Sequence, residues 1–266
     1  MDIVKDIRQD LPGTGTRKLI YLLKENYGIR YGRDKLFALL DRENLLIRQR
    51  HRKPRTTWSG HPFPVYPNLV KDIVPMRPNE VWVSDITYIK TVEGFKYLFL
   101  ITDMYSRKIV GWSLAADMRA EHALEALRMA LAQKGDGGLS TIHHSDRGTQ
   151  YCCSDYVAAL KADSIKISMT EKGDPRENAY AERINGTIKN EFLKHISCAP
   201  DEFQTAVCNS IQAYNVLRPH ASIDYMTPEE AHARSGEIKR RWKHYPWYHK
   251  DNQKENVTFA AATNQG

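Results

Sequence analysis

Three strand patterns in direct succession, followed by alternating helices and strands, place the tightest limit on the fold of this chain. The three segments are VWVSDITYIK (81–90), FKYLFLITDMYS (95–106) and RKIVGWSLA (107–115), and all are rich in β-branched and aromatic residues. Residues 92–94 have the length of a tight turn between the first two. Neighbouring strands joined this way pair antiparallel, so the pattern predicts an antiparallel start to the sheet.

Helical and strand patterns alternate after this point. An apolar stripe predicts a helix over 119–134, and its members are Ala120, Ala123, Leu124, Leu127 and Leu131. Shorter patterns predict strands over 139–143 and 165–169, with a helix over 154–163 between them. Capping residues predict a long helix from 175 to about 195, another over 200–217 and a short one from Thr227. This order predicts a ribonuclease-H-like α/β fold, with a mixed five-stranded sheet flanked by helices.

Two short amphipathic helices are predicted before this domain, over 16–26 and 33–44, with Gly28 and Gly32 in the turn. They resemble a helix-turn-helix unit that binds DNA, although a helical hairpin for protein contacts has the same pattern. The predicted organisation is a basic helix-turn-helix-like segment (1–53), a proline-rich linker (54–78), a catalytic core (79–235) and a basic, aromatic tail (236–266).

The positive charge of the chain is concentrated near its N-terminus. Residues 1–60 carry 14 Lys and Arg against 7 Asp and Glu, whereas the remainder is balanced, 25 against 25. Five basic side chains fall within eight residues: Arg48, Arg50, Arg52, Lys53 and Arg55. Such a cluster suits DNA phosphates, with a solvated linker as the alternative. The tail 239–250 mixes five basic residues with four aromatic ones, which suits phosphate contact and base stacking, disorder being the alternative.

Several classes of protein are disfavoured by composition. No apolar run reaches the length of a membrane span, and the first ten residues lack the apolar middle of a signal peptide. We therefore expect a soluble cytoplasmic protein of a bacterium, with its four cysteines reduced. A zinc site at His143, His144, Cys152 and Cys153 is disfavoured, because adjacent strand residues point to opposite faces.

Three carboxylates carry the predicted chemistry. Asp85 lies inside an apolar strand, Asp146 follows a strand, and Glu182 lies about two turns into the long helix. Each alone is consistent with a solvated surface residue. Together they suit two Mg²⁺ or Mn²⁺ ions, because hard cations prefer oxygen ligands and such ion pairs catalyse phosphodiester displacement.

Other residues are candidates for supporting roles. Lys189 shares a helix face with Glu182 and is expected to reach a DNA phosphate, and Asn178 is expected to contact DNA or orient the glutamate. Ordinary surface positions are the alternative for both. His144 and Gln150 are candidate helpers beside Asp146, and Arg218 either binds DNA or braces the last long helix.

The spacing and four ordered motifs carry a family resemblance. There are 35 residues, 147–181, between Asp146 and Glu182. The motifs are WxxDITY (82–88), HSDRGxQY (144–151), ENAYAERxNGxIK (177–189) and YNxxRPH (214–220). In these features the chain resembles the catalytic (OrfB) subunit of two-frame bacterial insertion-sequence transposases, within the D,D-35-E integrase-core superfamily. Glu177, Asn185 and Gly186 depart from the usual pattern, and none of them belongs to the triad.

The resemblance implies an enzyme that cleaves DNA at the inverted-repeat ends of a mobile element and joins the 3′-hydroxyl to a target strand. It further implies a homo-oligomer, two divalent ions, and an upstream-frame (OrfA) product as partner or fusion. A non-catalytic DNA-binding protein that occupies the ends is one alternative, and a ribonuclease-H-like nuclease without strand transfer is another.

Overall fold

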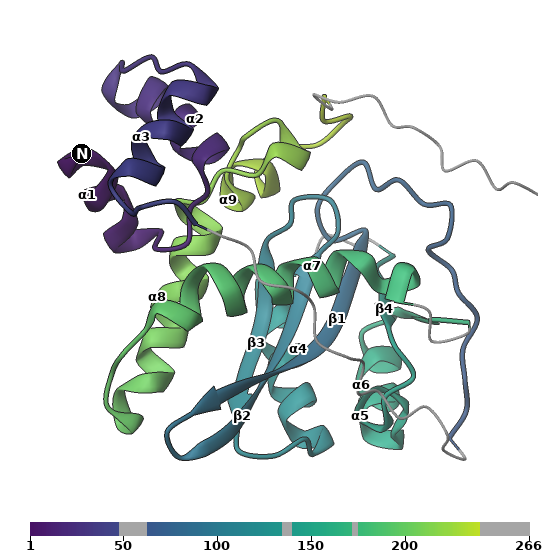
Figure 1. Ribbon diagram of the computed structural model, residues 1–266. Coiled ribbons are helices and arrows are strands. Elements are labelled where there is room, and N and C mark those ends of the chain that lie inside the picture. Colours follow the sequence, from purple (N-terminus) through teal and green to yellow (C-terminus); the bar gives the residue numbers. More distant parts are fainter. Residues whose placement is uncertain (48–62, 135–139, 172–174, 240–266) are drawn as a thin grey trace, which may run out of the picture.

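A five-stranded mixed sheet forms the centre of the molecule (Figure 1). The computed structural model describes residues 1–47, 63–134, 140–171 and 175–239. The strands are β1 (Val81–Thr91), β2 (Gly94–Asp103), β3 (Ile109–Ala115), β4 (Ile142–Ser145) and β5 (Lys166–Met169). Their order is β3-β2-β1-β4-β5, with β1 to β3 antiparallel and β4 and β5 parallel to β1. The predicted mixed five-stranded sheet is thus confirmed.

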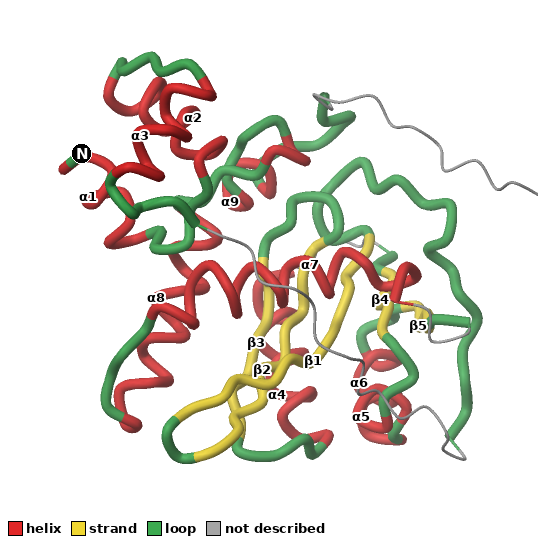
Figure 2. The backbone as a smooth tube through the Cα atoms, in the orientation of Figure 1, coloured by secondary structure: helices red, strands yellow, loops and turns green. Residues whose placement is uncertain are grey.

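Helices cover both faces of this sheet (Figure 2). One face packs on α4 (Ala120–Lys134), α5 (Thr149–Cys152) and α6 (Ser154–Ala162). The other packs on α7 (Ala179–Thr187) and α8 (Phe203–Val216). The short α9 (Pro228–His232) follows, with the predicted cap in which the Thr227 side chain accepts from the Glu230 amide. No helix in the described ranges is long and apolar enough to cross a membrane.

The α4 helix lies very close to β3. Its buried residues are Ala123, Ala126, Leu127 and Ala130, so the buried face is richer in alanine than the predicted stripe. The reason is a close backbone approach. A methyl group added at Gly111 of β3 would lie closer than 3.0 Å to the carbonyl oxygen of Ala126. Leu124 and Leu131 are consequently only partly buried at the margin of this contact.

Gly111→Ala should lower the free energy of unfolding by about 1–3 kcal/mol, because the added methyl group overpacks the contact between β3 and α4. The matched control is Gly186→Ala in α7, where the new methyl group would lie 3.9 Å from Asn190 Nδ2. There we expect stabilisation of up to about 1 kcal/mol from helix propensity. Urea unfolding of both variants tests whether their changes in unfolding free energy have opposite signs. A lower unfolding free energy for Gly186→Ala would contradict the packing around that residue.

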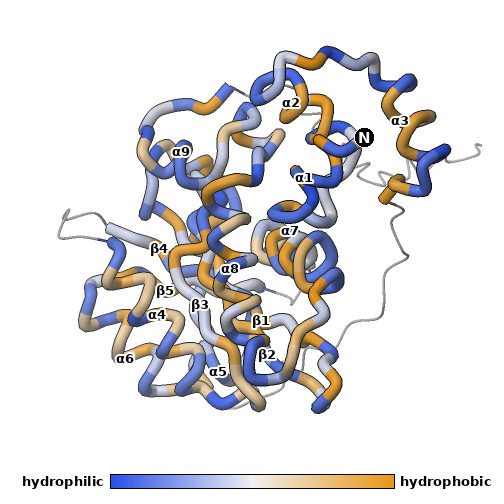
Figure 3. Tube along the Cα trace, turned by 90° about the vertical axis from the view of Figure 1, so that its left-hand side faces the viewer, coloured by the Kyte–Doolittle hydropathy of each residue, from blue (hydrophilic) through white to orange (hydrophobic). Residues whose placement is uncertain are grey.

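The N-terminal segment forms three helices, α1 (Asp2–Asp10), α2 (Thr16–Tyr27) and α3 (Arg33–Arg42). The last two were predicted. The first was missed, although Val4, Ile7 and Leu11 have helical spacing and are buried. All three helices contribute to one apolar cluster with α7 and α8, which lie beside α1 in Figure 3. The predicted domain boundaries stay a prediction, but the N-terminal helices share a core with the catalytic unit.

The predicted long helix after residue 174 consists of four consecutive segments of three helical types. A 3₁₀ turn (Pro175–Asn178) leads into α7, a π-helical segment (Ile188–Phe192) follows, and a second 3₁₀ turn (Leu193–His195) ends it. Short π-helical segments occur mostly as insertions in α-helices and often at functional sites. The prediction of one continuous helix was therefore right about extent and wrong about regularity.

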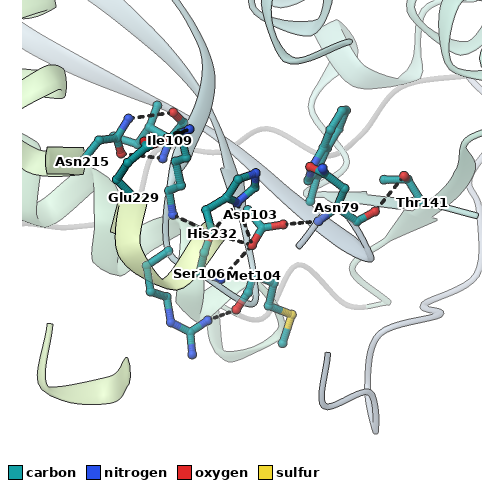
Figure 4. A network of polar contacts seen from close by, with 12 residues as sticks. Asn79, Asp103, Met104, Ser106, Ile109, Thr141, Asn215, Glu229 and His232 are labelled. Carbon is teal, nitrogen blue, oxygen red and sulfur yellow. Dashed lines mark hydrogen bonds and ion pairs between the residues drawn. The ribbon is translucent and has the colours of Figure 1, made fainter. Parts of the chain in front are cut away.

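A buried polar network at the end of β2 holds α9 in place (Figure 4). The carboxylate of Asp103 is fully buried and accepts hydrogen bonds from the amide of Asn79 and from both the amide and the hydroxyl of Ser106, each at 2.7 Å. The Ser106 hydroxyl also lies 2.9 Å from His232 Nδ1 of α9. Asp103 is therefore a saturated, structural carboxylate.

Candidate active site

The register of the sheet places Asp85 level with Asp146. Parallel pairing of β1 with β4 sets Val83 opposite His144. Asp85 and Asp146 each lie two residues beyond that pair, at the carboxyl end of β4. Because adjacent strands are about 4.8 Å apart, the two aspartates are neighbours at this point of the sheet. The sheet topology thus brings together two residues 61 positions apart in the sequence.

The loop after β4 orients Asp146. Its Oδ1 accepts a hydrogen bond from the amide of Gly148 at 2.9 Å. A methyl group on Gly148 would lie 3.0 Å from that same oxygen and from Gln150 Oε1, so the loop leaves little space for a larger residue. The Arg147 side chain donates to the carbonyls of Thr170 and Glu171. The turn that carries Asp146 is therefore fixed on both sides.

Two asparagines attach the glutamate-bearing helix to β1. Asn178 is buried, and its Nδ2 donates to the carbonyl of Ser84 at 2.9 Å. Asn185 is buried one turn after Glu182, and its Nδ2 donates to Asp85 Oδ2 at 2.9 Å. The other oxygen of Asp85 accepts from the amide of Ile86. These contacts hold α7 across the strand and orient the Asp85 carboxylate.

The electrostatics of Asp85 indicate a crowded acidic site. Burial raises the pKa of Asp85 to about 7, and the charges of Asp146 and Glu182 push it in the same direction. The hydrogen bonds from Asn185 and Ile86 oppose this shift without cancelling it. Burial also raises the pKa of Tyr151, with further contributions from Asp146 and Asp85. The three predicted carboxylates therefore act on one another within one region.

The donor chemistry of this region fits a divalent cation. Among the described residues, no three His, Cys, Asp or Glu side chains are placed closely enough together to hold a metal ion as they stand. Two observations nevertheless favour a cation. The charges of Asp146 and Glu182 add to burial in raising the pKa of Asp85, and the buried Oδ1 of Asn185 has no hydrogen-bond partner. A cation with its waters would relieve the repulsion, and oxygen donors are what Mg²⁺ and Mn²⁺ prefer.

The raised pKa of Asp85 predicts a pH dependence of the metal-free protein. The folded-state pKa of about 7 exceeds the usual value of 3.8, so the folded protein binds this proton more tightly than the unfolded chain. The stabilisation that this proton provides is complete below pH 3.8 and is lost as the pH rises to about 7. Relative to Asp85→Asn, wild type should therefore lose stability over this window.

Urea unfolding of both proteins at about pH 5 and about pH 8 measures the change. Added Mg²⁺ should restore the wild type at the higher pH and leave Asp85→Asn nearly unaffected. If wild type and Asp85→Asn differ in unfolding free energy by the same amount at both pH values, the raised pKa of Asp85 is contradicted.

Lys189 lies on the π-helical segment beyond Glu182. Its Nζ is 3.8 Å from the centroid of the Tyr88 ring, a cation–π contact with β1. The Tyr88 ring is itself packed edge-on against Phe95. The lysine is thus held near the exposed end of β1, and its contact with DNA stays a prediction. Asn178, by contrast, is engaged with the backbone of Ser84, which favours an orienting role over DNA contact.

His144 and Gln150 form hydrogen bonds with segments of the fold around the site. His144 is fully buried, with Nδ1 2.8 Å from the Ser168 hydroxyl and Nε2 3.1 Å from the carbonyl of Glu177. Burial lowers its pKa, so the ring is neutral and connects β4, β5 and the start of the glutamate-bearing helix. Gln150 donates to the carbonyl of Met118 at 2.8 Å. None of these contacts is to the carboxylate of Asp146.

His143 has a separate structural role. Its Nε2 lies 2.6 Å from the Ser84 hydroxyl and 2.9 Å from the Tyr156 hydroxyl, and burial lowers its pKa to about 3. The two adjacent histidines thus bond to different partners, as expected for neighbouring strand residues.

Arg218 is buried away from the triad, where it forms a bidentate pair with Glu191 and contacts His220. This placement favours the bracing role over DNA contact. The cluster Arg48, Arg50, Arg52, Lys53 and Arg55 lies outside the described residues, as does the tail from 240 onward. Their predicted contacts with DNA stay predictions.

Asn185 is the functional candidate that sequence reasoning did not identify. It stood out only as a departure from the family pattern. Its position three residues after Glu182, on the same helix face, was the available signal. Which of the two nearby carboxylates it would contact required the packing of α7 on β1.

Comparisons with known proteins identify the family of this chain. Two family models, both described as an integrase core domain, match residues 75–175 and 163–228. The IS600 uncharacterized 31 kDa protein of Shigella sonnei is 41% identical over 226 residues, which cover 84% of this chain and 78% of that protein. Transposase InsF for insertion sequence IS3A of Escherichia coli (strain K12) is 35% identical over 196 residues, covering 73% and 68%.

Solved structures show the same fold. The integrase catalytic core domain of HTLV-2, in complex with magnesium, has a TM-score of 0.50 at 20% identity and covers 60% of this chain and 100% of that chain. The simian T-cell lymphotropic virus intasome, in complex with PP2A regulatory subunit B56 gamma, has a TM-score of 0.52 at 18% identity, covering 76% and 67%.

Proposed function

We propose that this chain, which belongs to the insertion-sequence transposases with an integrase core, cuts and joins DNA strands at the inverted-repeat ends of a mobile element. The family's chemistry is polynucleotidyl transfer, and it depends on divalent metal. The observation that carries the proposal is the register that sets Asp85 beside Asp146, close enough to Glu182 that both charges raise the pKa of Asp85.

The three carboxylates are the proposed metal ligands. Asp85 and Asp146 contribute oxygens from adjacent strands, and Glu182 approaches from α7. Two Mg²⁺ or Mn²⁺ ions bound there would activate the attacking oxygen and stabilise the leaving oxygen of the phosphodiester. The chain's own contribution is orientation, because Asn185 and the Gly148 amide each fix one aspartate. Water or a 3′-hydroxyl is the proposed nucleophile, so no covalent enzyme intermediate forms.

DNA is the partner that follows from this function. We propose that the basic segment Arg48 to Arg55 and Lys189 contact DNA phosphates, at the element's ends and at the target. Pairing two ends requires at least two active sites, which favours a homo-oligomer. The upstream-frame (OrfA) product, as a partner or fusion, is the proposed source of further end recognition. Action would take place in the bacterial cytoplasm, at the nucleoid.

A joining assay tests the function. Labelled duplexes with the element's terminal repeats are incubated with the full chain, Mg²⁺ and target plasmid, with and without the upstream-frame product. We expect products joined through the 3′ end of the repeat, and none when EDTA removes the metal. Duplexes with scrambled repeats are the control.

The products separate the candidate functions. Nicked DNA without joined product would replace the proposal with a nuclease. Binding to the repeats without cleavage, with the upstream-frame product present, would favour a DNA-binding protein that occupies the ends. Joining that continues in EDTA would contradict the metal-dependent site.

A further inference from the structure

A charged cluster joins the N-terminal helices to the glutamate-bearing helix, away from the triad. Arg218 donates to both oxygens of Glu191, through Nε at 3.0 Å and Nη2 at 2.9 Å. Lys18, at the start of α2, places its Nζ 3.4 Å from both oxygens. The exposed fractions of these side chains are 5% for Arg218, 26% for Glu191 and 21% for Lys18, so the cluster is mostly withdrawn from solvent.

The backbone of the same glutamate also lies very close to the N-terminal helices. Gly13, between α1 and α2, lies so near that an added methyl group would be 2.8 Å from the carbonyl carbon of Glu191 and nearer still to its Cα. Around this contact, apolar side chains of the N-terminal helices and of the glutamate-bearing helix form one cluster, which includes Leu19, Leu22, Ile188 and Phe192. Charge, close backbone contact and apolar packing therefore coincide at one residue.

Glu191 belongs to the π-helical segment Ile188–Phe192, two residues after Lys189. This segment interrupts the regular hydrogen bonding that would fix the orientation of a continuous α-helix. Its geometry consequently depends on outside contacts. On one side Lys189 rests on Tyr88 of β1, and on the other Glu191 is held by Arg218 and Lys18.

We propose that Glu191 is a positioning residue, which fixes the N-terminal helical unit to the π-helical segment so that DNA held by that unit lies at a set place relative to the triad. The inference rests on the proposed function, because it presupposes that DNA meets both parts. Misplacement of a substrate by about 1 Å costs on the order of 100-fold in rate, so a rigid joint at this position has a direct effect on joining.

Two substitutions loosen the joint from the N-terminal side and leave the pair between Arg218 and Glu191 intact. Lys18→Met removes the cation and keeps an apolar stem, and Gly13→Ala forces the backbones apart. The matched control is Arg17→Met, which removes one positive charge from an exposed neighbour on the same helix. For each full-length variant, hydrogen exchange of residues 188–192, binding to terminal-repeat DNA and joining are measured.

Lys18→Met and Gly13→Ala should speed amide exchange in residues 188–192 and lower the joining rate by about 10-fold or more, with repeat binding largely retained. Arg17→Met should leave exchange at the wild-type level. Unchanged exchange in both joint variants would overturn the proposal, as would faster exchange with wild-type joining. If wild type joins no DNA, the proposed function fails, and the exchange measurement alone decides whether the joint exists.

Discussion

Glu182→Gln should abolish strand joining while leaving DNA binding in place. The substitution preserves shape and removes the charge that a divalent ion requires. Loss of a group that merely orients a metal ligand costs about 10–100-fold, so loss of a ligand should exceed 100-fold. Asp85→Asn and Asp146→Asn should behave alike, because all three carboxylates serve one site. Joining and cleavage of labelled terminal repeats, measured beside a gel-shift titration, give both quantities.

The control for this experiment is Glu121→Gln, an exposed glutamate at the start of α4, on the opposite face of the sheet from α7. It makes the same chemical change away from the triad and should retain wild-type joining. Equal loss in both variants would point to a general effect of charge on DNA handling. Activity in Glu182→Gln close to that of wild type would remove Glu182 from the proposed ligand set.

Arg218→Ala should cost about 3 kcal/mol of unfolding free energy, because it leaves Glu191 in a mostly buried position without its bidentate partner. The nearby Lys18 limits the loss to the lower end of the range for broken buried pairs. In a protein of this size the melting temperature should fall by about 6–12 °C. Thermal unfolding of the purified chain measures it.

The alternative role for Arg218, a phosphate contact, predicts a different result. Loss of one phosphate contact makes the slope of log binding constant against log salt concentration shallower by about one. It leaves the free energy of unfolding nearly unchanged. Arg128→Ala, an exposed arginine on α4, is the control for loss of one positive charge. A stable Arg218→Ala protein with a reduced salt slope would contradict the bracing role.

The sheet was predictable because its signals are local, whereas the prediction of the triad rested on three carboxylates taken together and on their spacing. β-branched and aromatic runs marked β1 to β3, and the alternation that follows marked the α/β architecture. Asp85 was conspicuous as a charged residue within an apolar strand. The pairing of Asp85 with Asp146 follows from the parallel register of β1 and β4, which a single sequence does not specify.

Other features depend on contacts between distant segments. The burial of the alanines of α4 follows from its close approach to Gly111, which lies on a strand and not on the helix itself. The π-helical segment is supported by Lys18 and Arg218, which lie on either side of it in the sequence.

The roles of the residues in the YNxxRPH motif also depend on contacts with distant segments. The Tyr214 hydroxyl donates to the carbonyl of Arg107, and the Asn215 amide pairs with both backbone groups of Ile109 at the edge of β3. For Arg218 of the same motif, the sequence was equally consistent with DNA contact and with bracing of the last long helix, and only the packing of α8 favours bracing.

The most direct test of the metal site is a crystal structure of the chain with terminal-repeat DNA and Mn²⁺, with the ions located by anomalous scattering. We predict anomalous density about 2.0–2.2 Å from carboxylate oxygens of Asp85 and Asp146, with Glu182 completing the site, and we predict that this density is lost in Asp85→Asn. Density elsewhere on the protein, with none between these carboxylates at saturating Mn²⁺, would contradict it.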